Sequence, residues 1–262
     1  MSRIFSIARI AWLELLRKKE LYVLGIMMAG VLGALLSVKA YGLDGAAGHI
    51  KELGLLLAWA LSWALAVNVT ARQIPQEESS GTIFPLLAKP LTRAEFLLGK
   101  WLGCWTVVCA ATTAFYLLAA LVAALRGGKF NPSALAQGLI LHFAALAVIS
   151  ALALFFSTRL HRDAAATLTF VATISARIFV PAIPNLCMYE FGWRRTGLLI
   201  LYYALPHLEL FDLRQRLVHG GAPAPGEAFI LALLYGAALT AALLILAWLA
   251  YRNKRFSRGT ML

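Results

Sequence analysis

Six apolar stretches, each long enough to cross a lipid bilayer, restrict what this sequence can fold into. A helix needs about 20 mostly apolar residues to span the hydrocarbon core. Inside that core every backbone amide needs a partner within its own helix or a closed barrel, and the alternation typical of barrel strands is absent. We therefore predict an all-α polytopic membrane protein with a single domain over residues 1–262. The six predicted spans are residues 21–37, 53–71, 101–125, 134–157, 164–183 and 228–251.

The composition agrees with a location in a membrane. Hydrophobic residues make up 61% of the chain and charged residues only 14%, with a mean hydropathy of +0.77, whereas soluble domains carry about 25% charged residues. The three cysteines have spacings that indicate neither a disulfide framework nor a CxxC metal site. These features exclude a cytosolic enzyme and a secreted disulfide scaffold.

The net charge of +12 indicates orientation in the membrane. In a soluble protein such an excess would suggest a nucleic-acid partner. In a chain this apolar, the positive-inside rule is the better explanation. An even number of spans puts both termini on one side, and placing them in the cytoplasm assigns most of the 24 Lys and Arg residues to that side. We expect cytoplasmic termini and no nucleic-acid partner.

Residues 1–20 have the pattern of an amphipathic helix that lies in the inner membrane interface and then turns into the first span. Apolar residues recur at helical spacing, and Arg17, Lys18 and Lys19 end the segment at the level of the headgroups. The alternative is a cytosolic extension with a partly apolar face. The residues predicted to share the apolar face are Ile4, Ala8, Ala11, Trp12, Leu15 and Leu16.

Two connections are long enough to suggest a function. One is the cytoplasmic loop over residues 72–95, and the other is the outer segment over residues 184–227. The outer segment contains nine apolar residues, 197–205, which are too few to cross a bilayer as a helix. We expect them to form a helix that either re-enters the membrane or lies on its outer surface.

The cytoplasmic loop has the start and stop signals of short helices. Thr82 can cap a helix over residues 83–88, and Pro90 would end it. Thr92 and Glu95 then form a T-x-x-E capping box directly before the third span. The loop is predicted to fold as one or two short helices parallel to the membrane.

Residues 77–100 of this loop, with GTIFPLLAKPLTR followed by FLLGK, resemble the corresponding loop of type-2 ABC transporter permeases, the membrane subunits of ABC exporters. The plan of an entry helix, six spans and a broken outer segment also fits that family, and residues 201–220 resemble the outer segment of one bacterial branch. The resemblance implies a permease in the bacterial cytoplasmic (inner) membrane that forms the translocation pathway as a dimer, commonly of identical subunits.

The resemblance also implies two cytosolic ATPase subunits that hold the loop as a coupling helix. The loop residues assigned to this contact are Glu77, Glu78, Gly81, Thr82, Pro85, Leu86, Leu87, Pro90 and Arg93. Ser79 departs from the pattern, because relatives often have a second acid there. The other interpretation of the same residues is a capped connector whose prolines only end helices.

The chain lacks the G-x-x-x-x-G-K-[ST] phosphate loop, since Gly99 and Lys100 precede Trp101. We therefore expect no cofactor and no metal in this chain, no enzymatic activity of its own, and ATP and Mg²⁺ in the partner ATPase. Two alternatives are a membrane-embedded enzyme of lipid metabolism, which would need an acid or His cluster at one surface, and a self-sufficient transporter or channel. The latter would need intramembrane acids, and the six predicted spans contain none.

Polar residues within the predicted spans are the remaining candidates for a pathway or for packing. Arg177 lies in the outer half of its span, where it could reach toward water or line a pathway. Asn68 and His142 could face the pathway or form hydrogen bonds between helices. Gly25, Ala29 and Gly33 form a line of small residues suited to a dimer face or an internal packing seam.

Overall fold

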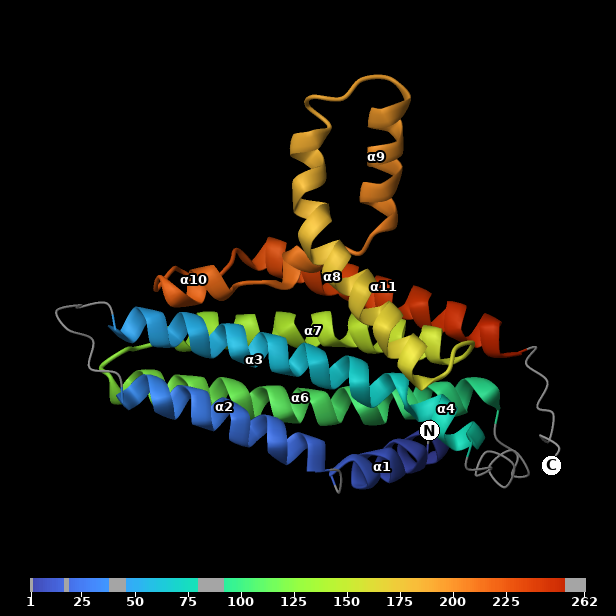
Figure 1. Ribbon diagram of the computed structural model, residues 1–262, viewed down its shortest axis with the longest axis horizontal. Helices are drawn as coiled ribbons and strands as arrows, with labels where there is room; N and C mark the ends of the chain where they lie inside the picture. Colours follow the sequence, from blue (N-terminus) through green and yellow to red (C-terminus); the bar gives the residue numbers. More distant parts are fainter. Residues whose placement is uncertain (1, 17–18, 38–45, 80–91, 253–262) are drawn as a thin grey trace.

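The computed structural model describes residues 2–16, 19–37, 46–79 and 92–252, and within these ranges the chain is helical, with no strand (Figure 1). The helices are α1 (Ser2–Leu16), α2 (Lys19–Ser37), α3 (Ala46–Ala71), α4 (Gln73–Ser79), α6 (Arg93–Leu125), α7 (Pro132–Ser157), α8 (Arg162–Leu186), α9 (Trp193–Ala204), the 3₁₀ helix η1 (Leu208–Phe211), α10 (Arg214–Val218) and α11 (Gly226–Arg252).

Five helical stretches in these ranges are long and apolar enough to cross a membrane. They match the second to sixth predicted spans and comprise Gly48–Ser79, Arg93–Leu125, Pro132–Ser157, Arg162–Leu186 and Gly226–Arg252. The predicted first span corresponds to α2. Its apolar stretch Tyr22–Ala34 is too short to be counted among the candidate spans. The all-helical membrane fold is confirmed with five spans, and the sixth stays a prediction.

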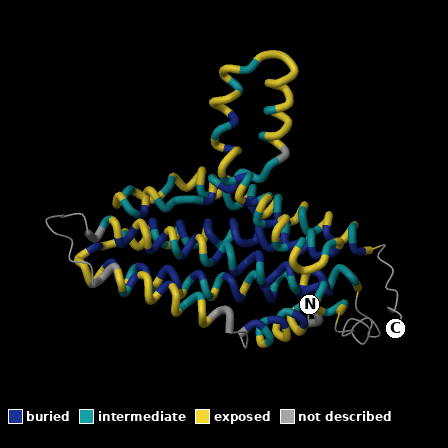
Figure 2. Tube along the Cα trace, in the orientation of Figure 1, coloured by how far each residue is buried: buried dark blue, intermediate teal, exposed yellow. Residues whose placement is uncertain are grey.

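Helices α3, α6 and α7 pack against one another along their lengths and form the centre of the bundle (Figure 1). Figure 2 shows the buried residues concentrated on these helices, whereas α11 lies along α7 and exposes most of its surface. The sequence of α7 explains its position, because small residues such as Gly138, Ala145 and Ala151 let its neighbours approach closely. The apolar surface on α11 suits contact with lipid or with another subunit.

Helix α1 packs against α6 at two glycines. A Cβ added at Gly99 would lie 2.7 Å from Cβ of Ile7, and one added at Gly103 would lie 2.7 Å from Cβ of Ala11. Since real side chains do not approach so closely, only glycine permits this crossing. The predicted apolar face is buried here against a helix, at Ala11 and Leu15.

The opposite side of α1 is less polar than its charged residues suggest. Phe5, Ile10 and Leu13 are exposed on it, which suits contact with lipid acyl chains. A position of α1 in the inner interface stays a prediction.

The end of α8 and the whole of α9 form a hairpin that stands away from the bundle (Figure 1). Pro181 and Pro184 lie inside α8, where each lacks the amide hydrogen that would bond to the preceding turn. Residues 197–205, predicted to be helical, belong almost entirely to α9. After α9 the chain returns to the bundle, where η1 and α10 pack on α7.

Candidate functional site

Glu77 of the predicted coupling loop faces another helix of its own chain. Its carboxylate forms an ion pair with Nζ of Lys100, and both side chains are largely buried. The same ammonium donates a hydrogen bond of 3.2 Å to Oε1 of Gln73. Lys100 thus links α6 to two residues of α4, which continues directly from α3. Glu78, the neighbouring acid, is half-buried.

Arg93 connects the beginning of α6 to the end of α11. Its guanidinium donates hydrogen bonds of 2.8 Å and 2.6 Å to the carbonyl oxygens of Tyr251 and Arg252, and it lies 5.9 Å from the centre of the Tyr251 ring. The last carbonyls of a helix have no partner within it, so an arginine there stabilises the helix end.

The predicted capping box before α6 is confirmed. Thr92 Oγ1 accepts a hydrogen bond from the amide of Glu95, and Glu95 Oε2 accepts one from the amide of Thr92. Together with the contacts of Glu77 and Arg93, it fixes both chain segments that enter and leave residues 80–91. The predicted coupling residues Gly81, Thr82, Pro85, Leu86, Leu87 and Pro90 lie outside the described residues.

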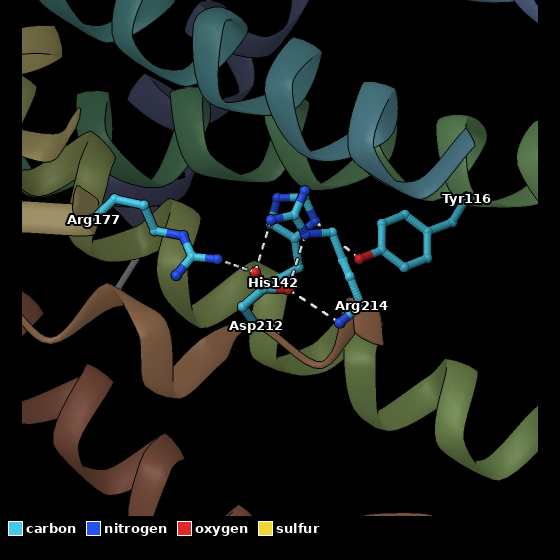
Figure 3. Close-up of polar contacts among 5 residues, drawn as sticks. All are labelled: Tyr116, His142, Arg177, Asp212 and Arg214. Carbon is cyan, nitrogen blue, oxygen red and sulfur yellow. Dashed lines mark hydrogen bonds and ion pairs between the residues drawn. The ribbon is translucent and has the colours of Figure 1, made fainter. Parts of the chain in front are cut away.

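A second polar cluster forms where Arg177 of α8 meets the outer segment (Figure 3). Arg177 forms an ion pair with Oδ2 of Asp212, the residue that follows η1. Arg214 donates to both oxygens of the same carboxylate, with its Nε 2.9 Å from Oδ1 and its Nη2 2.8 Å from Oδ2. Its backbone amide also donates to Oδ1. Arg177 thus has a charged partner within the chain, and its reach toward water and its role in a pathway both stay predictions.

The surroundings of Asp212 favour its ionised form. Burial by itself would raise the pKa of this carboxyl group, but the hydrogen bonds from Arg214 and the charges of Arg214 and Arg177 outweigh burial. The pKa therefore lies below its usual value. Asp212 stays charged and holds α8 and α10 together.

Aromatic and imidazole rings lie beside this ion-pair cluster. Both guanidinium groups lie near the face of Trp59 of α3, at 5.7 Å for Arg177 and 5.3 Å for Arg214 from the ring centre. His142 of α7 stacks on the same indole at 5.3 Å, and its Nδ1 lies 3.2 Å from Oη of Tyr116 on α6. The cluster thus connects α3, α6, α7, α8 and the outer segment.

The remaining intramembrane candidate, Asn68, bonds within its own helix. Its Nδ2 donates 2.9 Å to the carbonyl oxygen of Ala64. His142 contacts Tyr116 of another helix, whereas the hydrogen bond of Asn68 stays within α3. Arg177 is the candidate with a charged partner.

Asp212 and Arg214 were not singled out from the sequence as site residues. The signal that could have found them is the rule that an arginine within a membrane span needs a counter-ion, combined with the Asp-x-Arg pattern in the outer segment.

No group of three His, Cys, Asp or Glu side chains that could hold a metal ion occurs in the part of the chain that the structure describes. A line of small residues on α2 was left open between a dimer face and a packing seam. A Cβ added at Gly25 or Gly33 would meet no atom within 4 Å. Gly25 and Ala29 instead line an apolar groove between α2 and α6 of about 490 Å³.

The described part of the chain is thus a multi-pass helical bundle whose helices are connected by ion pairs. The family model for the ABC-2 family transporter protein matches residues 6–252. The chain therefore belongs to the ABC-2 transporter family and is a transmembrane permease of that kind. A search of the curated proteins finds no match.

Proposed function

We propose that this permease is the membrane subunit of an ATP-driven exporter and forms the translocation pathway as a dimer, with two separate ATPase subunits bound on its cytoplasmic side. Family membership supports the kind of partner. ATP and Mg²⁺ would be bound by those ATPase subunits. We further propose six spans, with α2 as the first, both termini in the cytoplasm, and a location in the bacterial cytoplasmic membrane.

The observation that carries the coupling proposal is the fixation of the cytoplasmic loop at both ends. Glu77 holds α4 to Lys100, and Arg93 holds the start of α6 to the end of α11. A force applied to residues 80–91 would therefore be transmitted through these contacts to α3, α6 and α11. In this proposal Glu77 and Arg93 anchor the coupling loop, and residues Leu86 and Leu87 contact the ATPase.

The experiment is co-purification with a candidate ABC ATPase, together with measurement of its ATP turnover. Replacing Leu86 and Leu87 by Asp should abolish the assembly and any stimulation of turnover. The control replaces Gln76 and Thr196 by Asp, because these two exposed residues receive the same added charges outside the positions assigned to the ATPase contact. Assembly that survives the leucine replacements would contradict the coupling assignment.

Orientation is tested separately with a reporter fused after Leu262. A reporter that works only in the cytoplasm should be active, and one that works only in the periplasm should be inactive, if the chain has six spans with cytoplasmic termini. The reverse pattern would show that the number of spans is odd or that the chain is inserted the other way round.

A further inference from the structure

The hairpin formed by the end of α8 and by α9 is anchored at its base. Val180 is fully buried there, and Tyr202 packs on the same core cluster, with its ring centre 4.4 Å from that of His207. The tip of the hairpin, residues 188–193, connects the two helices and turns at Gly192, whose positive φ of 67° suits glycine. The bundle therefore sets the direction in which the hairpin points.

The tip exposes an aromatic surface that no described residue covers. The side chains of Tyr189, Phe191 and Trp193 are 82%, 78% and 81% exposed, and Met188 beside them is 73% exposed. Since an aromatic side chain buries about 150–250 Å² when it is covered, the three rings alone offer on the order of 500 Å². An apolar surface of this size marks a contact with a protein or with a membrane.

The position of the hairpin argues against lipid as its cover. Figure 1 shows it leaving the bundle between the two ends, across the direction of α3, α6 and α7. Because these helices span the membrane, the hairpin extends sideways at the depth of the bilayer. Residues 187–192 are not helical, and the exposed Arg194 and Arg195 follow them. Irregular backbone and charged side chains at this depth are found where protein or water covers them, not against acyl chains.

A matching apolar surface lies on α11, on the same side of the bundle as the hairpin (Figure 1). Ile230, Leu231 and Leu234 are more than half exposed on it, and only 11% of the most apolar stretch of this helix is buried. Because both surfaces lie on one side, a two-fold axis along the membrane normal can place the tip of each copy on α11 of the other.

We propose that the tip of the hairpin binds a second copy of this chain, with its aromatic side chains packed on α11 of that copy. This inference rests on the dimer of the proposed function and assigns the surface that forms it. The two tips and the α11 surfaces that they cover amount to on the order of 2,000 Å², which is above the roughly 1,200 Å² at the lower end of stable interfaces.

The first measurement is photo-cross-linking of the full chain in native membranes, with p-benzoylphenylalanine in place of Phe191. We expect a product of twice the monomer mass, with the adduct on α11. The control carries the same group in place of Leu121, which is exposed on α6, on the side of the bundle away from the hairpin (Figure 1). It should give no such product. Adducts of the Phe191 position with lipid alone, or with a different protein, overturn the proposal.

The second measurement is the dissociation constant of the dimer, from analytical ultracentrifugation in mild detergent. Replacing Phe191 and Trp193 by Ala should raise it by about thirtyfold or more, because aromatic residues buried at an interface are its usual hot spots. Replacing Leu117 and Leu121 of α6 by Ala is the matched control and should leave it unchanged. All four side chains are exposed in the single chain, so neither double replacement should disturb its folding.

The outcomes separate this inference from the proposed dimer itself. A wild type that dimerises, together with a Phe191→Ala/Trp193→Ala protein that dimerises equally well, overturns the role of the hairpin and leaves the dimer standing. A wild type that stays monomeric at every concentration contradicts the dimer and the inference together.

Discussion

The two ends of the bundle each contain a carboxylate that is ion-paired across helices, and they differ in what surrounds the pair. At the end that we propose to face the cytoplasm, Glu77 and Lys100 are both largely buried, with Gln73 as an additional acceptor. Beside the outer segment, Asp212 is held by two arginines next to a cavity whose other acids, Glu52 and Glu209, have no ion pair among the described residues. The first pair is packed between two helices. The second borders a cavity.

The two ion pairs thus differ in their surroundings, because one is packed between helices and the other borders a cavity of about 330 Å³. The two places also differ in the ratio of acidic to basic groups. Lys100 pairs with one carboxylate, that of Glu77, whereas the cavity wall has more carboxylates than guanidinium groups.

The largest effect is expected from Asp212→Asn. This change leaves the charges of Arg177 and Arg214 without their counter-ion, and breaking a buried pair in this way destabilises a protein by about 3–5 kcal/mol. Unfolding in SDS measures the change in free energy. Asp163→Asn is the control, since its pair with Arg162 is exposed and such pairs contribute about 0–1 kcal/mol. Equal effects of the two changes would show that the Asp212 cluster contributes nothing special.

A smaller loss is expected from Glu77→Gln, because one buried cation rather than two loses its counter-ion and Gln73 remains in place. We expect about 3 kcal/mol, the lower end for breaking a buried ion pair. The combined exchange of Glu77→Lys and Lys100→Glu should recover most of this loss and also restore assembly with the ATPase. Recovery of stability without recovery of assembly would show that Glu77 contacts the ATPase directly.

Gly99→Ala is expected to destabilise by about 1 kcal/mol, because the added methyl group must displace Ile7 of α1 while alanine favours the helix. Gly25→Ala is the matched control, since no atom lies within 4 Å of the added Cβ, and it should stabilise α2 by up to about 1 kcal/mol. The same unfolding measurement compares the two. A harmless Gly99→Ala would show that α1 does not pack tightly on α6.

The smallest effect is a dependence of stability on pH at the Asp212 end. The pKa of Asp212 is lower in the folded chain than its usual value of about 4. Its contribution is therefore complete above that usual value and declines as the pH falls through the lower, folded pKa. The Tm of the wild type should decline more steeply in this acidic range than that of Asp212→Asn. Parallel curves would contradict the assignment.

Much of the fold could be predicted from the sequence, because length and hydropathy identify a membrane helix without knowledge of its neighbours. The same holds for the capping box, whose two partners, Thr92 and Glu95, are three residues apart. The start of α6 at Arg93, eight residues before the predicted span, follows from this cap.

The sites were harder to predict because their partners are distant in the sequence. Arg177 and Asp212 are 35 residues apart, and only the return of the outer segment brings them together. Small residues spaced four apart on a helix also look alike in a sequence, whichever helix carries them. The sequence pointed to Gly25, Ala29 and Gly33 on α2, whereas the residues that pack closely on another helix are Gly99 and Gly103 of α6. Which line meets a neighbouring helix depends on tertiary packing.

The central claim, coupling through the first cytoplasmic loop, is tested most directly by cross-linking. Leu86→Cys would be introduced after Cys104, Cys109 and Cys187 are replaced by Ala, and the protein would be mixed with its ATPase and a cysteine-to-lysine cross-linker. Thr196→Cys on the exposed side of α9 is the control. The account predicts a permease–ATPase product for Leu86→Cys and none for Thr196→Cys. Equal yields from the two positions, or none from Leu86→Cys in an assembled complex, would contradict it.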